Sequence, residues 1–218
     1  MTTPSRAAQI DARLKETYPR AAIALGYESN FQLLVAVILS AQTTDVGVNK
    51  VTPVLFSRFP TPGALAAADV AEVEVIVHPT GFFRNKTKNI MGAAQRIVAE
   101  YGGRVPDTME DLLTLPGVAR KTANIVLYNA FGKAEGIAVD THVFRLAHRL
   151  GFSAEEDPNK VERDLMALFP RAEWGELTYR LIEHGRAVCD AKRPICGQCV
   201  VADICPSAFK VKGWREQA

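Results

Sequence analysis

All four cysteines of this 218-residue chain lie in one short stretch near its C-terminus, at Cys189, Cys196, Cys199 and Cys205. Four thiolates so close together can hold a zinc ion or an iron–sulfur cluster. The N-terminus lacks the apolar core of a secretory signal, so we expect a cytoplasmic protein with reduced thiols, and a metal centre rather than disulfides. The C-x6-C-x2-C-x5-C spacing is neither that of a zinc ribbon nor that of the common ferredoxins.

A second stretch, residues 115–123 with the sequence Leu-Pro-Gly-Val-Ala-Arg-Lys-Thr-Ala, predicts two short helices joined by a tight turn. Gly117 permits a backbone conformation that other residues rarely adopt. The second helix would begin with free amides and a positive dipole end, which suits a phosphate oxygen. Such a contact positions DNA without reading its sequence. From this string alone, an ordinary turn between helices stays an equal alternative.

The elements around these stretches have a helical pattern throughout. A capping residue at Ser29 or Asn30 and a run that is apolar on every face predict a buried central helix. Val73, Glu74 and Val75 alternate as in a strand, but no other segment offers them a partner, so we expect a helix there too. A capping pair at Asp107 and Glu110 predicts the start of a short helix. The central helix is expected over 31–42, and further helices over 84–101, 119–131, 140–150 and from 157 onward.

Composition narrows the class of protein only broadly. With 48% hydrophobic and 23% charged residues, it is that of a globular protein. The net charge of +2 does not by itself indicate a nucleic-acid binder, so any basic surface must be local. The longest apolar run, residues 33–39, is far too short to span a membrane. We therefore expect no membrane partner.

Three strings together carry a resemblance to a known family. Residues 115–123 resemble the helix-hairpin-helix of the endonuclease III family of DNA glycosylases, residues 137–143 (Ile-Ala-Val-Asp-Thr-His-Val) its catalytic aspartate segment, and residues 39–45 (Leu-Ser-Ala-Gln-Thr-Thr-Asp) a third motif. The likeness covers about residues 25–210. Ala119 departs from it, because the hairpin usually has a second glycine there; alanine is tolerable if its φ is negative.

The resemblance implies an all-α fold of two helical domains with a cleft between them. Residues 23–133 would form a six-helix domain with the hairpin, and residues 1–22 plus 134–218 a domain that carries the cluster. The cysteine spacing matches the [4Fe–4S] motif of this family, so the resemblance favours iron over zinc. Four protein ligands leave no open position for substrate, so the expected role of the cluster is structural.

The implied activity is that of a bifunctional DNA glycosylase and AP lyase in base excision repair. Lys121 would attack the sugar C1′ of an oxidised pyrimidine nucleotide and form a Schiff base, after which elimination of the 3′ phosphate nicks the strand. A lysine is nucleophilic only as the neutral amine, which the helix dipole and the neighbouring Arg120 favour. Asp140, opposite it across the cleft, would stabilise positive charge at the anomeric carbon. As the first residue of a helix, Asp140 is also expected to act as an N-cap.

The partner implied is double-stranded DNA that contains damaged bases or abasic sites, bound by a monomer associated with the nucleoid. Because the target base leaves the stack, other groups must fill the gap. The resemblance suggests Gln42 and an apolar wedge at Phe82, where the family often has leucine. The expected DNA contacts are Gln42, Phe82, Arg84, Lys86, Gly117, Ala119, Arg120, Lys192 and Arg193, whereas the four histidines are interpreted as structural.

Three rival classes are weighed against this hypothesis. The adenine-removing mismatch glycosylases carry a catalytic glutamate where this chain has Val35, Ala36 and Val37, and they lack the nucleophilic lysine. A non-catalytic DNA-binding or redox-sensing protein would not need Lys121 and Asp140 together. A zinc-stabilised interaction module would show no affinity for DNA at low salt. The preferred lesion stays open.

Overall fold

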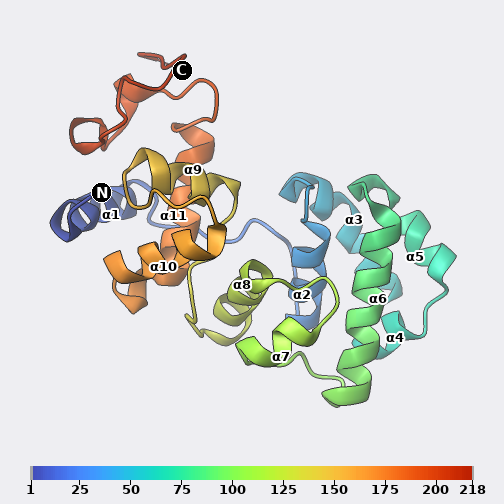
Figure 1. Cartoon of the computed structure of the whole chain (residues 1–218). Helices are drawn as coiled ribbons and strands as arrows, with labels where there is room; N and C mark the ends of the chain where they lie inside the picture. The colour runs from blue at the N-terminus through green and yellow to red at the C-terminus, as the bar shows by residue number, and fades with distance from the viewer. Residues whose placement is uncertain (1, 218) are drawn as a thin grey trace. The chain divides into compact units, whose positions relative to one another are not determined.

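The computed structural model describes residues 2–217, and these form helices and loops without a strand. The all-α prediction is therefore confirmed. The chain divides into two compact units: Ala24–Glu135, and Met1–Ile23 together with Gly136–Ala218 (Figure 1). None of the helices in the described part of the chain combines the length and the hydropathy that crossing a bilayer requires.

The unit Ala24–Glu135 is built around α2 (Asn30–Leu39), whose side chains are buried from Phe31 to Leu39. Helices α3, α6 and α8 pack against α2, which is the buried central helix that its uniformly apolar sequence predicts. The other helices of this unit are α3 (Asp45–Arg58), α4 (Pro62–Ala66), α5 (Val70–Val77), η1 (His78–Thr80), α6 (Phe83–Glu100), α7 (Met109–Thr114) and α8 (Arg120–Phe131) (Figure 1).

Helix ends follow local capping chemistry, with one correction to the prediction. Ser29 caps α2 by accepting from the Gln32 amide, as expected. The cap of α7 is Thr108, which accepts from the Asp111 amide at 3.2 Å; the predicted pair of Asp107 and Glu110 is wrong by one residue. Both pairs satisfy the same three-residue spacing, so the sequence alone did not separate them.

The segment with strand-like alternation is the helix α5. Asp69 caps it by accepting from the Glu72 amide, and Val73 and Val77 lie on its buried face. The predicted helix is therefore confirmed, and packing against α3 and α6 outweighs the strand preference of its β-branched residues.

The other unit contains α1 (Pro4–Thr17), α9 (Thr141–Arg149), α10 (Pro158–Leu168), η2 (Arg171–Glu173) and α11 (Trp174–Ala187). Between α11 and residue 217, the end of the described chain, there are two short turns, η3 (Cys196–Gln198) and η4 (Ala202–Ile204). Helix α1 was not predicted, although its signal is present: the side chain of Thr3 caps it and Pro4 occupies its first position. Its Ile10 and Leu14 join a core with residues of α9, α10 and α11.

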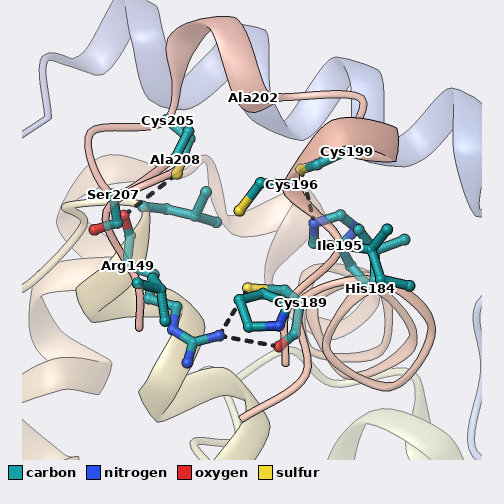
Figure 2. A pocket seen from close by; sticks show the side chains of 14 residues that line it. Arg149, His184, Cys189, Ile195, Cys196, Cys199, Ala202, Cys205, Ser207 and Ala208 are labelled. Atoms are coloured by element: carbon teal, nitrogen blue, oxygen red, sulfur yellow. Dashed lines mark hydrogen bonds between the residues drawn. The ribbon is translucent and has the colours of Figure 1, made fainter. Parts of the chain in front are cut away.

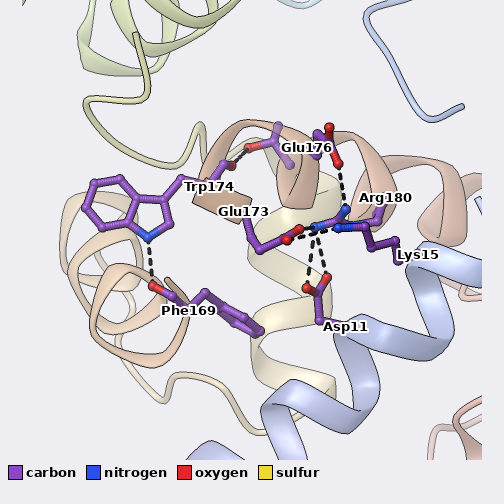
Figure 3. A network of polar contacts seen from close by, with 8 residues as sticks. Asp11, Lys15, Phe169, Glu173, Trp174, Glu176 and Arg180 are labelled. Carbon is purple, nitrogen blue, oxygen red and sulfur yellow. Dashed lines mark hydrogen bonds and ion pairs between the residues drawn. The ribbon is translucent and has the colours of Figure 1, made fainter. Parts of the chain in front are cut away.

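A buried arginine joins α1 to α11 (Figure 3). The Arg180 side chain is 2% exposed, and its guanidinium contacts Asp11 at 3.1 Å, Glu173 at 2.6 Å and Glu176 at 2.9 Å. Burial raises the pKa of Asp11, whereas a hydrogen bond from Lys15 lowers the pKa of Glu173. A buried charge with several partners is costly to break. The network therefore fixes α1 against the helix that leads to the first cysteine.

Candidate functional site

The predicted hairpin is present between α7 and α8. Gly117 has φ +77°, and a Cβ placed on it would lie 2.8 Å from the Cβ of Asn89, so only glycine fits this turn. Ala119 has φ −102° and ψ 173°, an extended conformation that any residue adopts. The departure from the second glycine of the family hairpin therefore introduces no backbone strain.

Lys121 lies in the first turn of α8 and is half-buried. The N-cap of this helix is Ala119, whose side chain has no acceptor for the amides of the first turn. These amides, Arg120 and Lys121 thus stand together at the positive end of a 12-residue helix. This is the arrangement expected for a backbone phosphate with an amine beside it.

Asp140 caps α9, as predicted. Its Oδ1 accepts from the amides of His142 and Val143, both at 2.8 Å. The carboxylate is therefore held in place by the helix that it begins, and it is half-buried. Asp140 belongs to one compact unit and Lys121 to the other, so their expected pairing stays a prediction.

Two loops of the unit Ala24–Glu135 carry exposed side chains on strained backbone. Gln42 has φ 55° and Phe82 has φ 47°, both in the left-handed region that side chains other than glycine seldom adopt. Such conformations cost of order 1–3 kcal/mol each and occur preferentially at functional sites. Phe82 is 68% exposed, and Gln42 is exposed too. Both side chains are thus exposed on strained backbone, and their insertion into DNA stays a prediction.

The cations predicted beside these loops differ in their placement. Arg84 is exposed, with its guanidinium 4.8 Å from the ring centroid of Phe83. Lys86, in contrast, is only 4% exposed. Its ammonium donates to Thr43 Oγ1 at 2.6 Å and to the Thr80 carbonyl at 2.7 Å. The prediction that Lys86 contacts DNA directly is therefore corrected: the residue belongs to the interior.

The four cysteines line one hollow together with Arg149 and His184 (Figure 2). They form no disulfide. In the described part of the chain, no three or more His, Cys, Asp or Glu side chains are gathered closely enough to hold a single metal ion. A mononuclear zinc site requires all its sulfurs about 2.3 Å from one point. Sulfurs spread around a hollow fit a multi-atom cluster better.

Hydrogen bonds and burial at the sulfurs support the same fit (Figure 2). Arg149 Nη1 donates to Cys189 Sγ at 3.3 Å, and His184 Nε2 lies 3.5 Å from Cys199 Sγ. Burial raises the pKa of the Cys199 thiol to about 11, so this thiol needs a nearby cation to ionise at neutral pH. Iron would supply that positive charge.

His184 has a more specific role than the structural one predicted for it. Tyr18 OH lies 3.0 Å from His184 Nδ1. Burial raises the pKa of Tyr18 to about 12 and lowers the pKa of His184 to about 4, so a neutral phenol faces a neutral imidazole. The phenol then donates to Nδ1, which leaves the Nε2 proton for the sulfur of Cys199. Sequence reasoning missed these contacts because Tyr18 and His184 are 166 residues apart.

Lys192 and Arg193 lie in the loop between the first two cysteines, and both are exposed. Their backbone amides donate to Asp190 Oδ1, each at 2.9 Å, which fixes the turn that carries them. The loop therefore presents two cationic side chains to solvent.

Comparisons with known proteins define the class to which this fold and these sites belong. The family model of the HhH-GPD superfamily base excision DNA repair protein matches residues 35–171. The iron–sulfur binding domain of endonuclease III matches residues 189–205, the segment with the four cysteines. The molecule is thus a helix-hairpin-helix protein of base excision repair with an iron–sulfur cluster.

Individual relatives narrow this class. An endonuclease III from Synechocystis sp. is 57% identical over 203 residues, which are 93% of this chain and 93% of the relative. A solved non-covalent endonuclease III–DNA complex superposes with a TM-score of 0.92 at 39% identity, covering 96% of this chain and 98% of that one. A trapped covalent endonuclease III–DNA intermediate gives the same TM-score and identity over 96% and 99%. This chain belongs to the endonuclease III family.

Proposed function

We propose that this protein is a bifunctional DNA glycosylase and AP lyase that removes oxidised pyrimidines from double-stranded DNA. The observation that carries the proposal is the placement of Lys121 beside the uncapped amides of α8, directly after the hairpin turn. An amine at a phosphate-binding helix end is positioned to reach the sugar of the nucleotide whose phosphate is bound. Family membership and the likeness to a covalent endonuclease III–DNA intermediate support the same activity.

The reaction follows from the chemistry of a neutral amine. Lys121 Nζ forms a bond to C1′, the bond from C1′ to the base breaks, and the base leaves with a proton. Ring opening gives a Schiff base between Nζ and C1′. Loss of a proton from C2′ then breaks the bond between C3′ and its oxygen, and the 3′ phosphate leaves. Hydrolysis of the Schiff base regenerates Lys121.

Asp140 acts while positive charge develops at C1′. A carboxylate held by two amide hydrogen bonds from its own helix is preorganised, so little reorganisation is needed when the charge appears. The same side chain thereby stabilises both α9 and the reacting sugar.

DNA is bound through several groups that do not react. The amides of the turn at Gly117 and Ala119, with Arg120, receive one backbone phosphate. Gln42 and Phe82 occupy the gap that the extruded base leaves. Arg84, Lys192 and Arg193 contact phosphates at a distance from the reaction.

We assign the four cysteines as the ligands of the [4Fe–4S] cluster, and the two compact units as the functional domains. The cluster domain comprises residues 1–22 plus 134–218 and the hairpin domain residues 23–133, a division supported by the compact units described above; the hairpin domain has seven described α-helices rather than the six expected. The cluster supplies a crosslink rather than a reacting group, because all four positions for protein ligands are filled. The enzyme would work as a monomer on nucleoid DNA in the cytoplasm.

Removal of iron should loosen the end of the chain selectively. Within residues 189–217 the structure has short turns and few buried apolar side chains, among them Ile195 and Val201. Without the cluster, no binding free energy would offset the conformational entropy that this segment loses when it becomes ordered. Oxidative loss of iron should therefore accelerate proteolysis within 189–217 at least ~10-fold, while fragments from 24–135 stay protected. Equal protection of both regions after complete iron loss would contradict the crosslinking role.

An incision assay tests the proposed activity directly. Duplexes that carry an oxidised pyrimidine, an oxidised purine, a mismatched adenine or an abasic site are incubated with the iron-loaded protein, with and without borohydride. We expect strand cleavage at the oxidised pyrimidine and the abasic site, and a covalent adduct that borohydride traps on both. Base release without any trapped adduct would exclude the lysine mechanism, and no reaction on any duplex would exclude a glycosylase.

A further inference from the structure

The buried ammonium of Lys86 lies between the two strained loops described above, and the proposed chemistry does not use it. It donates to Thr43, the residue after Gln42, and to the carbonyl of Thr80, two residues before Phe82. Thr43 Oγ1 also donates to the same Thr80 carbonyl at 2.5 Å. Lys86, Thr43 and Thr80 thus form one hydrogen-bonded group, which we call the Lys86 cluster.

From one residue of α6, the Lys86 cluster forms hydrogen bonds to both loops. The first loop comprises residues 40–44 and the second loop residues 79–83. The backbone amide of Lys86 donates to the carbonyl of Phe82 at 3.1 Å, so this residue holds the second loop through its main chain as well as its side chain. Thr80 is 3% exposed, and its own hydroxyl donates to the Val77 carbonyl at 2.8 Å. The second loop is therefore anchored on its buried side, while its tip stays exposed.

Burying a lysine at this position costs free energy, because its ammonium loses contact with water. Burial lowers the pKa of Lys86, and among residues 2–217 no acidic side chain pairs with it. A methionine of similar length would avoid the cost of burying an ammonium. Strained backbone persists only where its surroundings hold it, and two strained residues lie within two positions of the atoms that Lys86 binds. The ammonium is therefore placed to maintain the loops rather than to stabilise the core.

We propose that Lys86 is the positioning residue that sets Gln42 and Phe82 together, so that both enter the DNA stack as a preformed pair. This inference rests on the proposed function for the insertion itself. The hydrogen bonds between the loops do not depend on that function. Lys86 touches neither substrate nor cofactor in this role.

The variant Lys86→Met tests the proposal, with Lys50→Met as its matched control on the exposed surface of α3. Amide hydrogen exchange of the DNA-free holoenzyme should be at least ~10-fold faster in residues 40–44 and 79–83 of Lys86→Met, with other segments unchanged. The control should match wild type. Unchanged exchange in both loops would overturn the positioning role, whatever the activity of the enzyme.

A second readout compares AP lyase rates on an abasic site in duplex and in single-stranded DNA. Only the duplex has a partner strand and a stack whose gap must be filled. We expect Lys86→Met to lose about 10-fold on duplex, because misplaced groups at such sites cost up to about 100-fold, and less than about twofold on single strands. An equal loss on both would mean a general structural role and overturn the proposal. A wild type inactive on both would reject the proposed function but leave the exchange result standing.

Thr43→Val provides a variant that keeps the lysine. It removes the hydroxyl that Lys86 binds at 2.6 Å and preserves the shape of the side chain. If Lys86→Met does not fold, Thr43→Val should still accelerate exchange in both loops and lower the ratio of duplex to single-strand rate about threefold. A change confined to residues 40–44 would overturn the proposal, because the two loops would then be independent.

Discussion

Lys121→Ala is expected to abolish the borohydride-trapped adduct and to lower AP lyase activity by at least ~10³-fold. No other group can form the Schiff base if Lys121 is the nucleophile. Because the side chain is half-buried in the first turn of α8, the free energy of unfolding should change by less than about 1 kcal/mol. Single-turnover lyase rates, adduct formation on gels and thermal unfolding measure the three effects.

Two companion variants make this result specific. Lys121→Gln preserves the length of the side chain and should be as inactive as Lys121→Ala, whereas Lys50→Ala should trap DNA like wild type. Binding of the inactive variants to an uncleavable abasic analogue should stay within about threefold, since neither substitution removes the turn amides and Arg120 that are proposed to receive the phosphate. If borohydride still trapped a protein–DNA adduct with both variants of Lys121, the proposed lysine mechanism would be excluded.

Local sequence signals predicted the turn before α8 and the capping residue of α9 correctly. Turns and caps depend on neighbouring residues, so the hairpin could be predicted from Gly117 and the start of α9 from Asp140. Helix α5 was predicted by excluding a strand partner, not by propensity. The capping register at α7 was missed because Asp107 and Thr108 each have an acidic residue three positions later.

Contacts between distant segments have no comparable signal in the sequence. In the sequence, Lys86 has the appearance of another surface cation in a basic stretch. In the fold, its buried ammonium donates to Thr43, which lies 43 residues away. In the same way, nothing near His184 in the sequence indicates Tyr18. Hydrogen bonds of this kind become visible only when the fold places the loops together.

Asp140→Asn is expected to separate the two roles of Asp140, as a cap and as a charge. Asparagine caps helices about as well as aspartate, so thermal stability should stay within about 0.5 kcal/mol of wild type. Removing the negative charge should nevertheless lower the rate of base release about 10²- to 10³-fold, the typical loss for one preorganised electrostatic contact. Asp140→Ala should lose a similar amount of activity and also about 1 kcal/mol of stability.

Asp157 provides a matched control for this experiment. It caps α10 in the same way, with its Oδ1 accepting from the amides of Asn159 at 2.8 Å and Lys160 at 3.1 Å. Asp157→Asn should leave both stability and activity unchanged, and Asp157→Ala should lower stability by about 1 kcal/mol without a specific loss of base release. Full activity in Asp140→Asn would show that this carboxylate only begins a helix. Because asparagine keeps the cap, a loss of activity at unchanged stability must come from the missing charge.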